Sequence, residues 1–268
     1  MRERAVRWVA WTLQLGLLGA CGPGSAPPPD AVPWFEGDFD SGDLSAWGLD
    51  LARPESIEIV DRPTRAGPGA ARLTLAPGDR AASKERAELR LRDHDLERRH
   101  AGQGQEVWYA WSLWLPEELA DPTPGQFQML AQWHHRPVPR EDRKSFFVVG
   151  APPLALHLQP SPGGSELVLL GRSAARREPR VIAERVVARQ AWVDLLFRIR
   201  WSTGADGEVE AWLDGHPWTD GVARGANLYN STGNYLRLGL YRRRGGEGTD
   251  RIYVDEVRIG PTRTSVAP

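Results

Sequence analysis

Short runs of alternating apolar and polar residues recur through most of the chain and constrain its fold more than any other feature. The clearest run is 235–242, where Leu236, Leu238 and Leu240 alternate with tyrosine, arginine and glycine. Because successive side chains of a β-strand point to opposite faces, such a run predicts a strand with one buried face. The expected strands are Ser56–Val60, Ala71–Leu75, Ala87–Leu91, Val107–Leu115, Phe146–Val149, Leu154–Leu158, Glu166–Leu170, Trp192–Trp201, Glu208–Leu213, Tyr235–Tyr241 and Ile252–Ile259.

Few amphipathic helical patterns interrupt these runs, and turn signals such as Asp206-Gly207 and Asp214-Gly215 separate some of them. The pattern predicts an all-β chain, a β-sandwich of the jelly-roll type with two antiparallel sheets and a concave cleft. Helices are expected only in loops such as Pro116–Leu119, and the charge-rich segment 172–189 predicts a loop followed by an edge strand. With 268 residues, 41% of them apolar, the chain can form one sizeable core.

The charge of the chain is close to balanced, with a formal net charge of -1. This argues against a whole-protein field that attracts nucleic acid. Only Lys84 and Lys144 among the 34 basic residues are lysines. Genome base composition is the simplest explanation of the arginine excess, although arginine also suits bidentate carboxylate binding. Most of the 12 tryptophans are expected in the core, with stacking on sugar rings as the alternative.

Residues 1–21 predict an export signal of the lipoprotein type. Three arginines precede an apolar stretch, residues 8–18, that is shorter than the roughly 20 residues of a membrane span. The stretch ends in Leu-Gly-Ala-Cys21, which resembles the bacterial lipobox, and Cys21 is the only cysteine. We therefore expect Cys21 to be lipidated and the protein to be exported and anchored in the cell envelope, in the outer membrane. The alternative is an ordinary signal peptide with a chance cysteine.

The remaining boundaries follow from composition. Residues 22–33 are rich in proline and glycine and predict an extended linker. Residues 34–262 are expected to form the single folded domain, and residues 263–268 a tail.

Three polar segments lie on expected strands. In the first, Arg86, Glu88 and Arg90 share one strand face, and Ala87 and Leu89 share the other. The apolar face belongs in the core, so the charged face points to solvent or to a cleft. Taken alone, this segment is explained by a solvated face with an Arg–Glu pair.

The second segment is Gln132-Trp133-His134, in which Gln132 and His134 share a face and Trp133 points inward. Alone, these are also ordinary surface residues. In the third segment, Tyr235, Arg237, Gly239 and Tyr241 share the face opposite the three leucines. We interpret Gly239 as a gap in that face, which lets a ligand approach the backbone.

In this chain order the three segments resemble the jelly-roll polysaccharide lyases, which include alginate, glucuronan and heparin lyases. The family signatures Arg-Ser/Thr-Glu-Leu-Arg, Gln-Ile/Val-His and Tyr-Phe-Lys-Ala-Gly-x-Tyr correspond here to residues 86–90, 132–134 and 235–241. The resemblance spans about residues 34–260 and implies a concanavalin A-like sandwich. Ala87, Trp133 and Arg237 depart from the signatures, which leaves the identity of the polymer open.

The resemblance implies an enzyme that cleaves a uronic-acid-containing polysaccharide by β-elimination and leaves 4,5-unsaturated uronate ends. Arg86 and Gln132 correspond to the groups that stabilise charge on the substrate carboxylate. His134 corresponds to a base and Tyr241 to the proton donor, although which of the two is the base stays open. The resemblance and the strand faces together suggest substrate contacts at Arg237, Glu88, Arg90 and Tyr235. Lys144, just before an apolar run, and Asn234 are further candidate contacts, with a surface lysine and a turn residue as the alternatives.

This scheme requires no cofactor and no catalytic metal, and it leaves a structural calcium ion open. The expected partner is an acidic polysaccharide and not a nucleic acid. Membrane contact is expected through the lipid anchor only, and we expect a monomer.

Two other functions compete with this one. A non-catalytic carbohydrate-binding lipoprotein can have the same fold, but it does not need an aligned Arg, Gln, His and Tyr set. A glycoside hydrolase needs paired carboxylates, and we do not find the laminarinase-type motif Glu-x-Asp-x-x-Glu in the chain. His157 lies on an expected strand, where a core or edge histidine is the favoured interpretation over a cleft residue.

Overall fold

The computed structural model describes residues 29–81, 84–91, 101–123, 126–136, 151–162, 164–173, 176–242 and 245–267. Within these ranges the regular structure is mainly β-strand. Helical turns are short: η1 (Pro29–Ala31), η2 (Pro54–Ser56) and α2 (Arg263–Val266).

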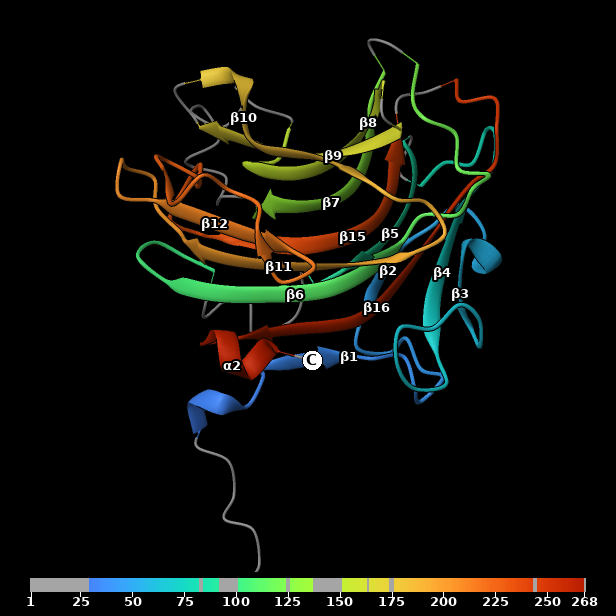
Figure 1. Cartoon of the computed structure of the whole chain (residues 1–268), viewed down its shortest axis with the longest axis horizontal. Coiled ribbons are helices and arrows are strands. Elements are labelled where there is room, and N and C mark those ends of the chain that lie inside the picture. Colours follow the sequence, from blue (N-terminus) through green and yellow to red (C-terminus); the bar gives the residue numbers. More distant parts are fainter. Residues whose placement is uncertain are drawn as a thin grey trace, which may run out of the picture.

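The first sheet has seven strands, all paired antiparallel, in the order β10-β9-β8-β7-β15-β5-β2. In Figure 1 its strands β10, β9, β8, β7 and β15 follow one another from the top of the view toward its middle. The bounds are β2 Gly48–Asp50, β5 Glu85–Arg90, β7 Gln128–His135, β8 Leu154–Ser161, β9 Gly164–Ser173, β10 Arg176–Val187 and β15 Asn234–Arg242.

The second sheet has nine strands and runs β13-β12-β11-β6-β16-β4-β3, with β1 paired to β16 and β14 paired to β12. All of its pairs are antiparallel. The bounds are β1 Phe35–Gly37, β3 Ile57–Val60, β4 Ala70–Leu75, β6 Glu106–Trp114, β11 Trp192–Arg200, β12 Glu208–Leu213, β13 His216–Pro217, β14 Ala223–Arg224 and β16 Asp250–Gly260.

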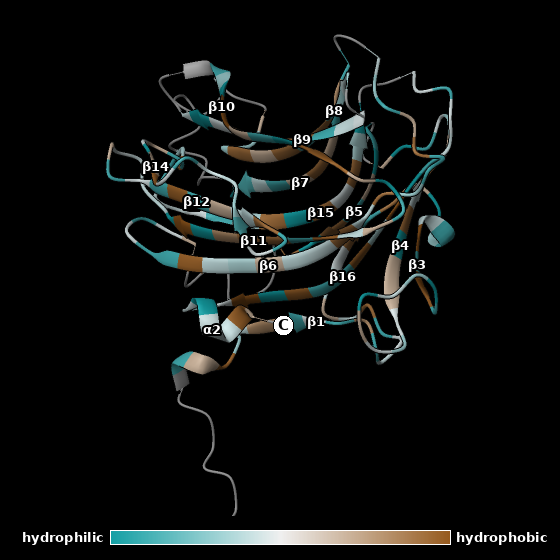
Figure 2. Ribbon diagram, viewed as in Figure 1, coloured by the Kyte–Doolittle hydropathy of each residue, from teal (hydrophilic) through white to brown (hydrophobic). Residues whose placement is uncertain are grey.

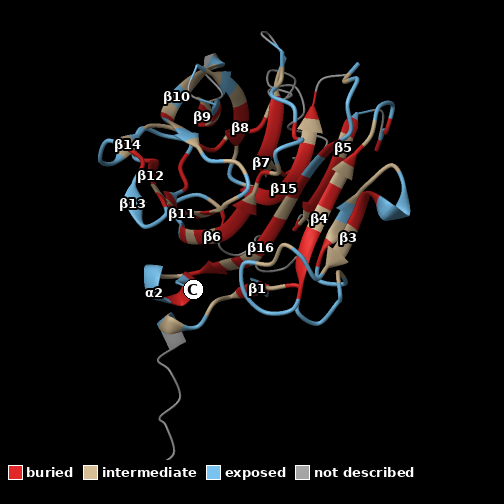
Figure 3. Ribbon diagram, turned by 45° about the vertical axis from the view of Figure 1, so that its right-hand side comes forward, coloured by how far each residue is buried: buried red, intermediate tan, exposed pale blue. Residues whose placement is uncertain are grey.

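The core lies between the two sheets and is built from the apolar face of each strand. Figure 2 shows apolar and polar segments alternating along β15 and β16, and Figure 3 shows buried residues concentrated in the strands. Trp133 of β7 is fully buried and packs on Trp111 of β6 and Phe197 of β11, with ring centroids 5.8 Å and 5.1 Å away. Aromatic rings from both sheets therefore fill the centre of the sandwich.

The predicted fold class, an all-β sandwich of two antiparallel sheets, is confirmed. The turn at Asp214-Gly215 is also confirmed: both residues have positive φ, 50° and 76°, and join β12 to β13. This is the backbone of a two-residue hairpin with a right-handed strand twist. The segment after Arg172 likewise contains an edge strand, β10.

Other expectations differ from the structure. The strands β1 and β2 are only three residues long and were not predicted, because such short runs carry no alternation. Ser56 belongs to η2 rather than to the following strand, and Pro116–Leu119 forms a turn and not a helix. The expected strand Phe146–Val149 lies outside the described residues.

The end of the chain is more ordered than the expected tail. Thr262 caps α2, since its hydroxyl accepts a hydrogen bond from the Ser265 amide at 3.2 Å. Val266 is buried and Thr262 also donates a hydrogen bond to the Asp30 carbonyl at 2.6 Å. The last turn therefore fastens residues of the expected linker to the sandwich. No helix in the described ranges is long and apolar enough to cross a bilayer.

The strand assignment predicts the effect of core truncation. Leu236 is fully buried on the central strand β15, so Leu236→Ala should lower the free energy of unfolding by about 2–5 kcal/mol. Urea denaturation of the purified domain measures this loss. Val181→Ala on edge strand β10 removes a side chain that is 56% exposed and should change stability by about 0.5 kcal/mol or less. Equal effects of the two changes would contradict the placement of the core.

Candidate active site

Three neighbouring strands of the seven-stranded sheet bring the predicted side chains together. They lie on the sheet face that is turned away from the core, opposite the leucines of β15. The directly opposed pairs are Tyr241 with Arg86, Arg237 with Gln132, and Tyr235 with His134.

A cleft of about 440 Å³ lies over this face. Its described lining contains three cationic side chains and no carboxylate, so it presents a positive wall to a ligand. The lining residues are Lys84, Arg86, Phe127, Met129, Gln132, His134, Ala151, Pro152, His157, Arg172 and Tyr241. All four predicted catalytic residues are among them.

Tyr241 is held at the cleft by two ring contacts. The guanidinium of Arg86 lies 4.5 Å from the Tyr241 ring centroid, and Phe127 meets the ring edge-on at 5.4 Å. A cation over an aromatic face is an attractive contact. Arg86 therefore fixes the phenol beside a positive charge.

Glu88 lies beneath the cleft and connects the three strands. It is 2% exposed and accepts hydrogen bonds from the Gln132 amide and, at 3.0 Å, from the Arg237 guanidinium. Burial raises the pKa of the Glu88 carboxyl from its ordinary value, and the charges of Arg237 and Arg86 oppose that shift. Since one N–H of the Gln132 amide donates to Glu88, the orientation of this amide at the cleft is fixed.

Asp50 completes this network, and no sequence pattern predicted its role. It lies at the end of β2 and forms ion pairs with Arg237 and Arg90, the latter at 2.8 Å. Arg86 is farther from both acids, 3.3 Å from Glu88 and 3.6 Å from Asp50. Of the three guanidinium groups that face these two described carboxylates, Arg86 makes the longest contacts, and it is the one that lines the cleft.

His134 is in the form that a proton acceptor requires. Its Nδ1 lies 2.9 Å from the carbonyl oxygen of His135, and since a carbonyl only accepts, Nδ1 carries the proton and Nε2 has a free lone pair. Burial, with the charges of His135, Arg237 and Arg86, lowers the pKa of His134 to about 3, although the backbone bond opposes this. The imidazole is therefore neutral at physiological pH.

Several predicted substrate contacts are placed deeper than the cleft. Arg237 is 5% exposed and, like Glu88 and Arg90, belongs to the ionic network and does not line the cleft. Tyr235 is buried beside His134, with ring centroids 5.6 Å apart. These residues hold the lining side chains from below.

Asn234 is placed elsewhere, which corrects its expected contact with a sugar. It is fully buried, and its amide donates to the Asn227 carbonyl at 3.3 Å. Its side chain lies on the core side of β15, because it alternates with Tyr235. The other two predicted positions, Lys144 and the lipidation site Cys21, lie outside the described residues.

The interpretation of Gly239 as a gap for a ligand is also corrected. Its φ is 142°, and a Cβ there would lie 2.2 Å from the Ala87 carbonyl oxygen and 2.7 Å from Leu73. The glycine is therefore required by the backbone and by the close approach of β5. It lies where the pairing of β15 with β7 is irregular, between Leu238 and Tyr241.

Sequence reasoning missed part of the lining. Phe127 and Met129 precede the Gln-Trp-His segment and were not singled out. His157 was expected as a core or edge residue, but it faces the cleft, because Leu156 and Leu158 on either side of it are the core residues of β8. The alternation of His157 with two leucines could have predicted this orientation. It was overlooked because the residues around His157 in the sequence are mostly apolar.

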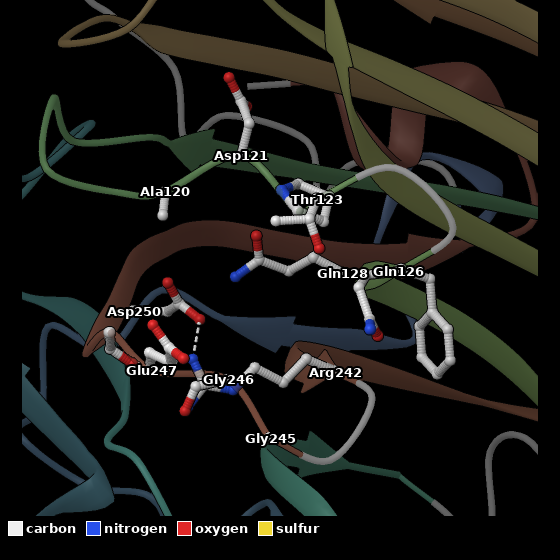
Figure 4. A pocket seen from close by; sticks show the side chains of 13 residues that line it. Ala120, Asp121, Thr123, Gln126, Gln128, Arg242, Gly245, Gly246, Glu247 and Asp250 are labelled. Atoms are coloured by element: carbon white, nitrogen blue, oxygen red, sulfur yellow. Dashed lines mark hydrogen bonds and ion pairs between the residues drawn. The ribbon is translucent and has the colours of Figure 1, made fainter.

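Phe127 also lines a second pocket, of about 370 Å³, and Figure 4 shows that pocket. There Arg242 forms ion pairs with Asp250 of the opposite sheet and, at 3.0 Å, with Glu85. All three side chains are buried. These ion pairs link the two sheets. Because the charge of Arg242 is already neutralised by two carboxylates, the pocket is a poor site for an anion. No group of three or more His, Cys, Asp or Glu side chains that could hold a metal ion occurs in the described ranges.

Comparisons with known proteins agree on the type of scaffold. A family model described as polysaccharide lyase matches residues 39–258. No curated protein matches the chain in sequence. Three solved structures share the fold: an endo-β-1,4-glucuronan lyase from the fungus Trichoderma reesei, a GH131 β-glucanase catalytic domain from Podospora anserina, and an alginate lyase from Pseudomonas aeruginosa.

All three similarities extend over nearly the whole of the other chain. The glucuronan lyase is 19% identical, with 88% of this chain and 98% of that chain covered and a TM-score of 0.61. For the β-glucanase the corresponding values are 18%, 88%, 100% and 0.55. For the alginate lyase they are 18%, 82%, 100% and 0.52.

The neutral state of His134 leads to a prediction on pH. The pKa of a histidine in an unfolded chain is about 6.5, whereas in the fold that of His134 is about 3. Between these values the unfolded chain binds the proton more tightly, so the stability contributed by neutral His134 is present above pH 6.5 and is lost as the pH falls. NMR of the imidazole, assigned with His134→Gln, should show no protonation between pH 5 and 8. A midpoint inside that window would contradict the neutral form.

Proposed function

The chain belongs to the polysaccharide lyase family, and we propose that it cleaves a uronic-acid-containing polysaccharide by β-elimination. One observation carries this proposal: Arg86, Gln132, His134 and Tyr241 line one cleft whose described lining contains cations and no carboxylate. An anionic polymer is the ligand that such a wall attracts. A glucuronan lyase and an alginate lyase, both enzymes named for acidic polymers, have the same fold.

The carboxylate of the reacting uronate is bound by Arg86 and Gln132 in this mechanism. Arg86 lines the cleft, and its guanidinium lies no closer than 3.3 Å to Glu88 and 3.6 Å to Asp50, so its positive charge faces the ligand. The Gln132 amide is oriented by Glu88 and donates its second N–H to the carboxylate. Both groups stabilise the negative charge that grows on the carboxylate as the C5 proton leaves.

His134 Nε2 accepts the C5 proton. The C–H electron pair forms the C4=C5 double bond, the C4–O bond breaks, and the leaving oxygen takes the proton of the Tyr241 hydroxyl. The bound carboxylate raises the pKa of His134 by its charge and makes it a stronger base. The proton then passes from His134 to restore Tyr241, directly or through water, and the enzyme is unchanged. The steps use side chains of the chain alone, and we propose no cofactor for them.

The β-glucanase with the same fold raises a second candidate, a glycoside hydrolase. Hydrolysis of a glycosidic bond needs two carboxyl groups that flank it. Glu88, the carboxylate just beneath the catalytic side chains, is buried and bound to Gln132 and Arg237. These contacts favour elimination over hydrolysis.

For localisation, we propose export and attachment to the cell envelope by a lipid on Cys21. The lipobox-like ending of residues 1–21 supports this. Mass spectrometry of the protein from a membrane fraction should show acyl groups on Cys21, and Cys21→Ala should release the protein from the membrane.

The elimination itself is tested by its product. Residues 31–268 should be incubated with polyglucuronate, alginate, pectate, hyaluronan, heparin and heparan sulfate, and ultraviolet absorbance of the unsaturated uronate should rise on at least one of them. Tyr241→Phe and His134→Ala should each lower the rate at least about 100-fold, because each removes a proton-transfer group. Tyr253→Phe, the same chemical change on the opposite sheet, should leave the rate unchanged. Full activity in folded Tyr241→Phe and His134→Ala would refute these roles.

A further inference from the structure

The proposed mechanism leaves one side of the cleft without a function. On β8 and β9 the cleft is lined by His157 and Arg172. His157 is 6% exposed, and its Nε2 has no hydrogen-bond partner among the described residues. A buried polar atom without a partner is costly to the fold, so an occupant of the cleft is the natural partner.

The register of the sheet sets these two residues opposite the catalytic pair. Met129 of β7 pairs with Tyr241 on one side and with His157 on the other. Farther along these strands, beyond the Gln132–Arg237 pair, His134 pairs with Tyr235, and the Arg172 amide donates to the Pro153 carbonyl at 2.7 Å. Arg172 on β9 is therefore two strands from His134, a separation of about 10 Å between the backbones.

Arg86 lies still farther from Arg172. It is on β5, and β15, β7 and β8 separate that strand from β9. Four strand spacings amount to about 19 Å between the backbones. A carboxylate held between Arg86 and Gln132 therefore lies on the β5 side of the cleft, whereas Arg172 reaches into the cleft from its β9 side.

Arg172 differs from the arginines of the buried network in its partners. Arg90 and Arg237 pair with carboxylates, whereas the one hydrogen bond of the Arg172 guanidinium within the described part of the chain is a long one, 3.5 Å, to the Pro152 carbonyl. Burial lowers the pKa of Arg172, and Tyr229 and Glu178 only partly oppose this. Burial and the Arg172 charge together lower the pKa of His157 to about 4. A bound anion would satisfy both groups.

The surface continues beyond Arg172. A smaller hollow of about 160 Å³ adjoins it and is lined by residues such as Gly171, Arg180 and Gly225. Arg172 thus lies between this hollow and the main cleft, on a path that crosses the strands. An extended polymer laid along that path passes from the catalytic side chains over His157 and Arg172.

Resting on the proposed lyase function, we propose that Arg172 and His157 form a second carboxylate-binding subsite. It holds a further uronate of the same chain while Arg86 and Gln132 hold the reacting one. The guanidinium binds the carboxylate in a bidentate manner and neutral His157 donates one hydrogen bond from Nε2. The enzyme therefore gains affinity from each chain long enough to reach both positions, and acts on polyuronate chains in preference to their shortest fragments.

Binding is measured first, because it does not depend on turnover. In the Tyr241→Phe variant, titration calorimetry should measure the binding of size-fractionated oligomers of glucuronate and of alginate uronates. The dissociation constant should fall once an oligomer spans both positions. Arg172→Gln should raise the dissociation constant for those longer oligomers at least about tenfold and leave that of the short ones unchanged. Arg172→Lys, which keeps the charge, should retain part of the affinity.

The matched control is Arg251→Gln, which removes an exposed arginine from β16 on the opposite sheet. It should bind oligomers of every length as the parent does. In the active protein Arg172→Gln should raise KM for the polymer with little change in kcat, since the lost contact is made equally in the bound substrate and in the transition state. Circular dichroism and the unfolding temperature confirm that each variant is folded.

The outcomes separate the two proposals. If no polymer gives an unsaturated product, the lyase mechanism is refuted. The dependence of the dissociation constant on oligomer length still tests the subsite in that case. Equal loss of affinity for short and long oligomers in Arg172→Gln, or equal effects of Arg172→Gln and Arg251→Gln, refutes the subsite. If Arg172→Gln lowers kcat alone and leaves KM unchanged, Arg172 acts in the chemical step and the subsite is also refuted.

Discussion

The carboxylate of Glu88 joins the three strands that carry the catalytic side chains. Its own strand is β5, its partner Gln132 is on β7 and its partner Arg237 is on β15. A carboxylate buried to this extent persists only with such partners, and loss of one partner typically costs about 3–5 kcal/mol. The bond to Glu88 orients the Gln132 amide, and the Arg86 guanidinium also lies 3.3 Å from Glu88. The position of the substrate-binding groups is therefore a consequence of the way one buried charge is compensated.

The charge balance of this network explains why the cleft is positive although the whole chain is nearly neutral. Asp50 and Glu88 are shared by Arg86, Arg90 and Arg237. Arg90 and Arg237 make the shorter contacts with these carboxylates, whereas Arg86 makes the longer ones and lines the cleft. Arg86 in turn stacks on Tyr241 and disfavours the protonated form of His134. A single guanidinium thus contributes to the anion site and contacts the proton donor, while burial is the main cause of the neutral His134.

The sequence was sufficient for those features that depend on alternation. The inward leucines of β15, the inward Trp133 and the shared face of Gln132 and His134 all follow from the two-residue period of a strand. Features that depend on contacts between distant segments were not predictable in this way. Asp50 ends a strand of three residues, and its role arises only when β2 lies beside β5. Gly239 was misinterpreted because its constraint comes from Ala87 and Leu73, which are distant in sequence.

The scaffold alone does not determine the chemistry, since lyases and a β-glucanase share it. What distinguishes this chain is how its outward residues are distributed over the strands. Those on β5, β7 and β15 form a charged and hydrogen-bonded group around Glu88, whereas β8 and β9 present a histidine and an arginine with few partners in the described structure. A site that only positions one reacting sugar has no need of the second group. On one side of the cleft the charged groups already have partners in the protein, and on the other side His157 and Arg172 have few in the described structure. A polymeric anion, with charges at more than one position, would supply partners to the second side as well.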